Sequence, residues 1–527
     1  MAGDARLSSV VDRHVGELSK PGVLSVRPGY KVTGGWLTDT PAIVVTVEHK
    51  TAQLPPDQLL LTEVAGVPVD VRQASPEKRK ELTDPAGYAA DLRITPDRGS
   101  VPHFPQERTL AGVRPAAAAS AHAALAVAHA TKRELHYTPA HGVTLEPVHA
   151  EATIQIGASP DSGWKMLEPF LQATTARLTV GLYDFTSAHV ETAVAAALAG
   201  KRLELVLDHP AKNPTADQTD AQTVAELRAA LGDRVTQSWA LTRPDPEVSA
   251  WIFPSAYHIK VAVRDHLAFW LSSGNWNNSN QPDIDPVTNP ADATAARHYD
   301  RDWHVIIEEP TLAHTFDQYL AHDRTIAKAH NLPAQSPGAP LPPPSLPSSE
   351  APPFAQFFAP LSITATMTIV PVLTPDPGVY AGAAKELLAS ARHTLYLQYQ
   401  YIEPPRAGAT DADGFLDLIH AVIDRQQAGV EVKIIMSEFE KVGYLEQLQG
   451  LGLDVVDNVK IQNNVHNKGI IVDGQAVLVS SQNWSTDGTL YNRDAGVIIH
   501  NARAAQYFQT IFLHDWDHLA VTQALPD

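Results

Sequence analysis

Two long stretches of the chain alternate short apolar runs with amphipathic segments, in the same order. The apolar runs have the length of buried strands, and the segments between them have the periodicity of helices. Strands that alternate with helices favour an α/β fold, with helices on the faces of a mixed, mostly parallel sheet. The predicted strand, helix and strand lie at 177–184, 188–199 and 202–207 in the first stretch, and at 392–399, 414–428 and 430–436 in the second.

The two stretches also resemble one another residue by residue, which indicates an internal repeat. Ser159-Pro160-Asp161 recurs 215 residues later as Thr374-Pro375-Asp376, and we match Arg177 with Arg392 at the same spacing. Further on, the spacing is 208 and then 192 residues, which places an extra loop in the first copy, around 281–296. The repeat predicts two homologous lobes related by a pseudo-twofold axis.

The rest of the sequence predicts three further segments. Short apolar runs separated by Gly and Pro turns indicate a small β-rich N-terminal domain of unknown role. A proline-rich stretch between the two copies is typical of a semi-rigid linker. The chain is therefore divided into the N-terminal domain (1–110), an Ala-rich tether (111–149), the first lobe (150–331), the Pro-rich linker (332–353) and the second lobe (354–527).

Composition and charge narrow the class of protein. Apolar residues make up 44% of the chain, which is enough to build a core, and the net charge of −19 argues against broad binding to a polyanion. The chain has no cysteine, so disulfides and thiolate metal sites are excluded. The first residues lack the apolar run of a secretion signal, and no stretch has the length and apolarity to span a bilayer. We therefore expect a cytoplasmic protein, which is compatible with a peripheral contact to a membrane.

The strongest chemical signal is a set of polar residues that occurs once in each copy. A histidine and a lysine two residues apart project from the same face of a strand, and an aspartate follows the lysine in the next turn. A second strand then ends in a Ser-Ser-x-Asn-Trp sequence. The first set is His258, Lys260, Asp265, Ser272 and Asn275; the second is His466, Lys468, Asp473, Ser480 and Asn483.

These residue types suit the cleavage of a phosphodiester. Lysines and asparagine amides supply the charge and the donors that its non-bridging oxygens need. A neutral imidazole can attack phosphorus, and a second, protonated imidazole can donate to the leaving oxygen and later accept a proton from water. A carboxylate is required to fix each imidazole. Asp302 and Asp494 follow the serine strands at matching places and are the candidates.

The two complete His-x-Lys-x4-Asp motifs, each followed by Ser-Ser-x-Asn, resemble the phospholipase D superfamily over both lobes. The resemblance implies a phosphodiesterase that needs no metal ion or cofactor, with His258 as the nucleophile and His466 as the general acid and base. The two lysines and two asparagines would hold the phosphate, and Asp302 or Asp494 would pair with a histidine. The remaining implied roles are structural for Asp265 and Asp473, and support of the histidines for Ser272 and Ser480 or their neighbours Ser273 and Ser481.

The substrate stays open at this point. Phospholipid-specific relatives often have a glycine where Ser272 and Ser480 stand. This difference does not change the predicted catalytic class, but it leaves the substrate undecided. A phospholipase D acting on glycerophospholipids and a nuclease acting on DNA or RNA would use the same site. A third hypothesis makes the N-terminal domain a sensor that holds the enzyme latent. Acidic net charge and aromatic-rich flanks favour the lipid.

Two other groups of polar residues could either have a structural role or bind a metal ion. His322-Asp323 and His514-Asp515 recur near the end of each copy, and their place on terminal helices favours a structural role over a metal site. The insertion at 281–296 is rich in Asp and Asn but lacks the spacing of a calcium-binding loop. We expect it to be a solvated loop.

Overall fold

The protein is described by a computed structural model. The described residues are 2–33, 36–48, 59–73, 82–83, 108–109, 133–134, 137–208, 217–240, 250–251, 256–296, 298–328, 356–405, 413–437 and 442–522. The predicted linker (332–353) and most of the predicted tether (111–149) lie outside them. Among the described residues, no helix combines the length and the apolarity needed to cross a bilayer.

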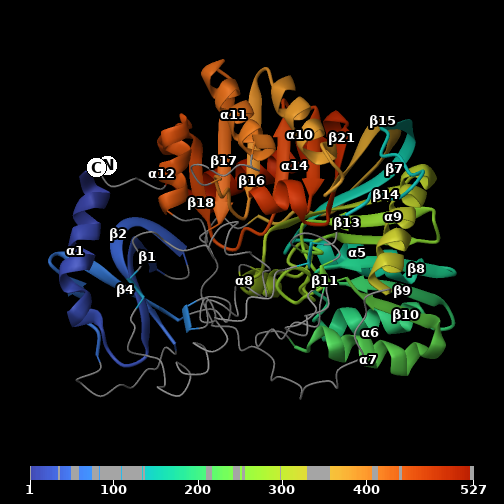
Figure 1. The fold of residues 1–527 in the computed structure, drawn as a ribbon, viewed down its shortest axis with the longest axis horizontal. Helices are drawn as coiled ribbons and strands as arrows, with labels where there is room; N and C mark the ends of the chain where they lie inside the picture. Colours follow the sequence, from blue (N-terminus) through green and yellow to red (C-terminus); the bar gives the residue numbers. More distant parts are fainter. Residues whose placement is uncertain are drawn as a thin grey trace.

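The N-terminal part forms a sheet with the strand order β3-β4-β2-β1-β5, packed against one helix (Figure 1). The three strands expected there are present. The helix α1 was not expected, although Leu7, Val10, Val11 and Leu18 lie on one face of it and are buried against the sheet. The elements are α1 (Ala2–Leu18), β1 (Val23–Thr33), β2 (Trp36–Val47), β3 (Glu63–Val64), β4 (Val67–Gln73) and β5 (Arg108–Thr109).

Most of the remaining chain builds one sheet of fifteen strands. The first copy contributes β7 (Val148–Ser159), α5 (Gly163–Gln172), β8 (Arg177–Leu182), α6 (Ala188–Ala197), β9 (Arg202–Leu207), α7 (Asp220–Leu231), β10 (Val235–Trp239), β12 (Lys260–Arg264), β13 (Ala268–Ser272), β14 (Asp302–Glu308) and α9 (Pro310–Lys328). The second copy contributes β15 (Leu361–Thr374), α10 (Val379–Ser390), β16 (Thr394–Tyr399), α11 (Asp413–Gln427), β17 (Glu431–Ser437), α12 (Val442–Leu451), β18 (Val459–Gln462), β19 (Lys468–Val472), β20 (Ala476–Ser480), β21 (Asp494–His500), α14 (Ala502–His514) and β22 (Val521–Thr522).

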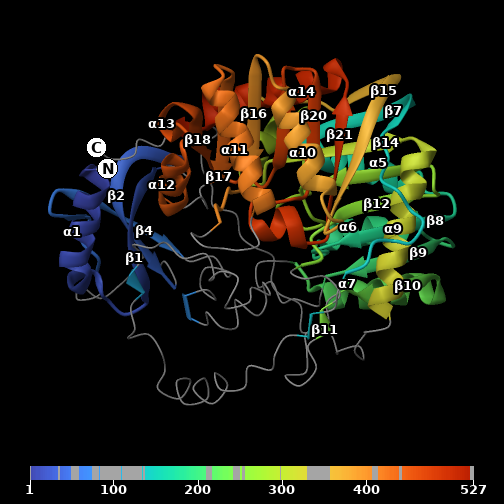
Figure 2. The same cartoon turned by 45° about the horizontal axis from the view of Figure 1, so that its top comes forward.

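The order of strands is the same in both copies when it is followed outward from the centre. Strands β7 and β15 pair with each other, and from them the sheet runs through β14-β13-β12-β8-β9-β10 on one side and β21-β20-β19-β16-β17-β18 on the other (Figures 1 and 2). The fold is thus mixed α/β with one large mixed sheet. The expectation that the sheet is mostly parallel is wrong. Between the strands of this sheet, parallel pairing is confined to β8-β9-β10 and β16-β17-β18. The pairs β12-β13 and β19-β20 are antiparallel hairpins, and the strands that follow them also pair antiparallel.

Helices cover both faces of the sheet, but the hydrophobic core is continuous on one face and divided into two clusters on the other. On one face, α9 and α14 bury a single hydrophobic cluster that runs through both copies. On the other face, the helices α5 to α7 and the helices α10 to α12 cover two separate clusters. The shared cluster fixes the two copies against each other, and this is the condition for an active site that uses residues from both.

One contact across the central boundary constrains the second motif. Trp303 of β14 is fully buried and stacks on Phe508 of α14, with ring centroids 4.6 Å apart. Gly469 of β19 lies against the same indole, and a Cβ at Gly469 would come within 2.3 Å of the ring. Position 469 therefore needs glycine because of a tryptophan in the other copy.

Around β8 and β16, the structure aligns the two copies differently from the alignment that was made from the sequence. Asp265 binds the backbone N–H groups of residues 175–177, whereas its counterpart Asp473 binds those of residues 392–394. Arg177 thus corresponds to Thr394, not to Arg392, and two residues are inserted before β16. The domain boundaries are otherwise untested and stay predictions.

Candidate active site

The two motif histidines lie where the copies meet, just before β12 and β19. The backbone N–H of His258 donates to the carbonyl of Arg493 at 2.8 Å, and that of His466 donates to the carbonyl of Arg301 at 3.1 Å. Each histidine strand therefore pairs with the segment before β21 or β14 of the other copy. The exposed fraction is 11% for the side chain of His258 and 15% for that of His466, so each imidazole is mostly buried but still partly accessible.

Each histidine is held by the aspartate of the opposite copy. Nδ1 of His258 lies 2.9 Å from Oδ1 of Asp494, and Nδ1 of His466 lies 2.9 Å from Oδ1 of Asp302. A carboxylate acceptor fixes the proton on Nδ1 and leaves the Nε2 lone pair of the neutral ring free for chemistry. Asp302 and Asp494 are thus placed as the sequence suggested, but the exchange between copies was not foreseen.

Two buried arginines produce this exchange. Arg301 precedes Asp302 and pairs with Asp161 of its own copy and Asp515 of the other, at 2.7 and 3.0 Å. Arg493 precedes Asp494 and pairs in the same manner with Asp323 at 2.6 Å and Asp376 at 3.3 Å. Neither arginine was predicted from the sequence. The signal was present, because the triplets Asp300-Arg301-Asp302 and Asn492-Arg493-Asp494 recur.

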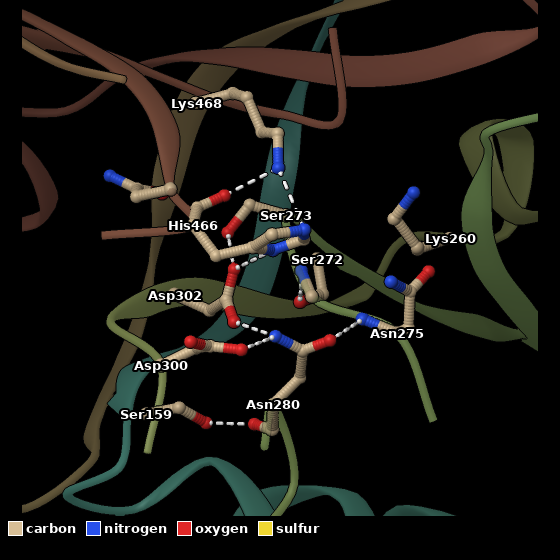
Figure 3. A network of polar contacts seen from close by, with 12 residues as sticks. Ser159, Lys260, Ser272, Ser273, Asn275, Asn280, Asp300, Asp302, His466 and Lys468 are labelled. Carbon is tan, nitrogen blue, oxygen red and sulfur yellow. Dashed lines mark hydrogen bonds and ion pairs between the residues drawn. The ribbon is translucent and has the colours of Figure 1, made fainter. Parts of the chain in front are cut away.

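Both motif lysines are fully buried, and Figure 3 shows Lys468 beside His466. Nζ of Lys260 donates to the carbonyl of His258, and Nζ of Lys468 donates to the carbonyl of His466. Nζ of Lys468 also lies 3.2 Å from Nε2 of His466. Burial lowers the pKa of Lys260 well below its usual value and that of Lys468 to about 8, so both ammonium groups gain from a bound anion.

The electrostatic setting differs between the two histidine–aspartate pairs. Burial raises the pKa of Asp494 to about 7, and Lys260 and Ser481 offset this only in part. Burial also acts on Asp302, but the charge and hydrogen bond of His466 outweigh it and hold the pKa of Asp302 well below its usual range. Burial and the neighbouring lysines lower the pKa of His258 strongly and that of His466 to about 4.

In each copy, the second serine of the Ser-Ser pair contacts the catalytic aspartate, and the first serine does not. Ser273 donates to Asp302 at 2.7 Å, and Ser481 donates to Asp494 at 2.5 Å, so these two serines support the histidines through the aspartates. Ser272 instead binds His304, and Ser480 donates to the carbonyl of Lys468. Of the two alternatives, Ser273 and Ser481 contact the aspartates directly and Ser272 and Ser480 do not, because alternate residues of a strand face opposite sides.

The motif aspartates lie away from the chemistry. Asp265 and Asp473 adopt positive φ of 54° and 52° in the hairpins β12-β13 and β19-β20. Their carboxylates accept from three consecutive backbone N–H groups each, at the start of β8 or just before β16. They fix the edge of the motif hairpin to a neighbouring strand.

Other polar and aromatic groups belong to this region, and two of them lie near Lys260. Asn275 and Asn483 are buried, and Figure 3 shows Asn275 next to Lys260. The ring of Tyr183 lies 5.0 Å from that of His258, and Nζ of Lys260 lies 5.3 Å from the centre of the tyrosine ring. Tyr183 was not singled out in the sequence, because the corresponding residue of the second copy, Gln400, is not aromatic.

The two groups that could have bound metals have protein partners. Asp323 and Asp515 pair with the buried arginines, as a structural role requires. In the insertion, Asp285 accepts from Thr288, and Asp292 accepts from the backbone N–H of Asp285. Within the described part of the chain, no group of three or more His, Asp or Glu side chains is placed to hold a metal ion.

Comparison with known protein families finds one match. Residues 384–516 match the family model described as the phospholipase D-like domain of cardiolipin synthase. This span contains the second histidine motif and the strand that begins at Asp494. No curated protein matches the sequence.

The solved structures to which this chain is similar include the following three. Phosphatidylserine synthase of Haemophilus influenzae has 12% identity and a TM-score of 0.46, over 72% of this chain and 90% of its own. Nuc of Salmonella typhimurium, a phospholipase D family member, has 19% identity and a TM-score of 0.25, over 29% of this chain and 98% of its own. Polyphosphate kinase of Porphyromonas gingivalis has 14% identity and a TM-score of 0.36, over 68% of this chain and 48% of its own.

Proposed function

We propose that this chain, which belongs to the phospholipase D superfamily, hydrolyses or exchanges the head group of a glycerophospholipid through a covalent phosphohistidine. The proposal rests on one observation: two imidazoles, each held at Nδ1 by a buried carboxylate, lie beside two buried lysines. The two lobes act as halves of one site related by a pseudo-twofold axis. Neither a metal ion nor an organic cofactor is required for the steps below.

In the first step, Nε2 of His258 attacks phosphorus. A P–N bond forms and the P–O bond to the head-group alcohol breaks, while His466 gives its Nε2 proton to the leaving oxygen. Lys260 and Lys468 neutralise the charge on the non-bridging oxygens, and Asn275 and Asn483 donate to them. The phosphodiester anion also favours the protonated form of His466, against the lysine charges that lower its pKa.

In the second step, His466 acts as the base. Water or an acceptor alcohol loses a proton to Nε2 of His466 and attacks phosphorus from the side that the head group left. The P–N bond breaks and its electron pair returns to His258. Water yields phosphatidic acid, and an alcohol yields a new phosphodiester. The matched family model is that of a lipid synthase domain, which supports a lipid substrate and transfer to an alcohol.

A parallel assay in EDTA tests the substrate. The full chain is given vesicles of phosphatidylcholine or phosphatidylethanolamine, with and without glycerol, and separately plasmid DNA and single-stranded RNA. We expect head-group release, with a glycerol product when the alcohol is present, and no cleavage of nucleic acid. Cleavage of DNA or RNA alone, lost when both His258 and His466 are alanine, would replace the lipid proposal with a nuclease. Lack of lipid cleavage by the full chain and by a chain without residues 1–110 would contradict the lipid proposal.

The pH dependence of activity is expected to show a narrow maximum between about 7 and about 8. Below the pKa of about 7, Asp494 holds a proton and can donate to His258, which moves the ring proton to Nε2 and blocks attack. Above the pKa of about 8, Lys468 loses the charge that holds the phosphate. The profile of kcat/KM tests this. In Lys468→Arg the alkaline limb should move to higher pH, because guanidinium stays charged; an unmoved limb would contradict the assignment to Lys468.

A further inference from the structure

The two half-sites are not equivalent, and the difference begins at one asparagine. Residues 275–279 of the first copy correspond to 483–487 of the second, since Asp300 N–H binds the carbonyl of Ser279 as Asn492 N–H binds that of Asp487. The next position is Asn280 in the first copy and Gly488 in the second. An amide side chain is therefore present in one half-site only.

Asn280 is 1% exposed and uses every polar group that it has. Its Nδ2 donates to Oδ2 of Asp302 at 2.8 Å and to Oδ2 of Asp300 at 2.9 Å. Its Oδ1 accepts from the backbone N–H of Asn275 at 3.0 Å. One side chain thus joins the carboxylate that holds His466 to the phosphate-binding asparagine (Figure 3).

A buried chain of hydrogen bonds holds Asn280 in place. Ser272 Oγ accepts from Gly274 N–H at 2.8 Å and donates to Nδ1 of His304 at 2.7 Å; this direction is fixed by the carbonyl of Asn280 at the other end of the chain, which can only accept. His304 then donates from Nε2 to Ser159 Oγ at 2.7 Å, and Ser159 donates to the carbonyl of Asn280 at 2.5 Å. Burial lowers the pKa of His304 to about 4, which agrees with the neutral ring that this direction of donors requires.

The second copy lacks this arrangement. Position 304 corresponds to Gly496, so no imidazole is present there. A Cβ at Gly488 would lie 2.2 Å from the carbonyl oxygen of Asn483, so no side chain fits at that position. Asp494 keeps the bond from Ser481 and an interaction with Asn492 that also lowers its pKa. No side chain at the position of Asn280 donates to it, and its Oδ2 has no hydrogen-bond partner among the described residues.

We propose that Asn280 is a positioning residue that assigns the catalytic roles, by holding Asp302 as a fully bonded anion so that His466 carries the proton and His258 attacks. This rests on the proposed phosphohistidine mechanism and adds the structural cause of its direction. A carboxylate stays ionised when donors bind both of its oxygens. Each oxygen has a second lone pair, and the ionised carboxylate can use one of these to stabilise an imidazolium. Asp494, with fewer donors, provides that stabilisation less well, and its histidine remains the neutral nucleophile.

The leaving group separates this role from a merely structural one. An alcohol such as choline needs a proton as it leaves, whereas p-nitrophenolate leaves without one. We expect Asn280→Ala to slow the release of choline from phosphatidylcholine about 10–100-fold, the usual effect of losing a partner of this kind. The initial burst of p-nitrophenol from phosphatidyl-p-nitrophenol should stay within a few-fold of the wild type. The steady rate after the burst should fall, because His466 is also the base of the second step.

Two further variants control for folding and charge. Asn280→Asp keeps the shape of the side chain but replaces the donor with an acceptor beside Asp300 and Asp302, and it should lose more choline release than Asn280→Ala. Asn501→Asp makes the same chemical change at the N-terminus of α14, where an oxygen acceptor is all that Ala504 N–H requires. This control should behave as the wild type with both substrates. Thermal melting of each variant shows whether it is folded.

Each outcome bears on one proposal. An equal loss for both leaving groups in a folded Asn280 variant, or no loss for either, would overturn the role of Asn280. If the wild type cleaves neither lipid, the proposed function fails, and the role of Asn280 fails with it for a separate reason.

Discussion

The His258→Ala variant is expected to lose essentially all turnover, with a fall on the order of 10⁶-fold, as when one member of a catalytic unit is removed. Nε2 of His258 is the atom that bonds to phosphorus, and no other described imidazole shares its position beside Asp494 and Lys260. No phospho-enzyme should form on brief incubation with labelled lipid and acid quenching. A labelled His258→Ala protein would contradict the assignment of the nucleophile.

The His466→Ala variant should differ in kind, not only in degree. Its turnover should fall about 10²–10⁴-fold, the contribution of a general acid or base. Labelled phospho-enzyme should accumulate with p-nitrophenol as the leaving group, because attack by His258 is retained and hydrolysis is slowed. His420→Ala, on an exposed face of α11, is the matched control and should keep full activity. Phosphate found on residue 466 of the wild type would reverse the two roles.

The largest effect on stability is expected from Arg493→Met. The change leaves Asp323 fully buried and Asp376 nearly so, without the guanidinium that pairs with both at 2.6 and 3.3 Å. Removal of one partner from a buried ion pair costs about 3–5 kcal/mol. The free energy of unfolding, from urea titration monitored by tryptophan fluorescence, should fall by that amount. Activity should fall as well, because Arg493 places Asp494.

Arg503→Met is the control for this loss. Arg503 is exposed on α14, and its replacement should change the free energy of unfolding by less than about 0.5 kcal/mol. A second variant, Arg493→Met with Asp323→Asn, removes one of the stranded charges and should recover part of the loss. Equal stability of Arg493→Met and the wild type would show that the ion pairs contribute nothing net.

The repeat explains why so much of the site could be predicted from one sequence. His258, Lys260 and Asn275 each recur at the same spacing, and chance rarely repeats a polar set at strand positions that face one pocket. The cross-pairing of histidines with aspartates could not be predicted in this way. The spacing shows which residues correspond, but contacts between the copies depend on how the two halves of the sheet join at β7 and β15.

Three other features went unpredicted for separate reasons. The apolar positions of α1 are few and its mean hydropathy is near neutral, so turns and strands dominated the interpretation of the first hundred residues. The antiparallel part of the sheet was missed because only the β-α-β part of each copy has an obvious pattern. Asn280 was missed because it does not recur. The cytoplasmic location stays a prediction.

The packing at the centre also limits how the two copies could diverge. At this centre, large side chains lie against glycines: Trp303 lies against Gly469, and Asn280 lies against Gly274. A Cβ atom at Gly274 would be 2.9 Å from the Cβ atom of Asn280. In the other copy the sizes are exchanged: Gln482 stands at the position of Gly274. Substitutions at these positions are acceptable only in compensating pairs. Transplanting a single residue from one copy to its counterpart should therefore be more harmful than exchanging a matched pair, and an ancestral symmetric form would have required a different packing at this centre.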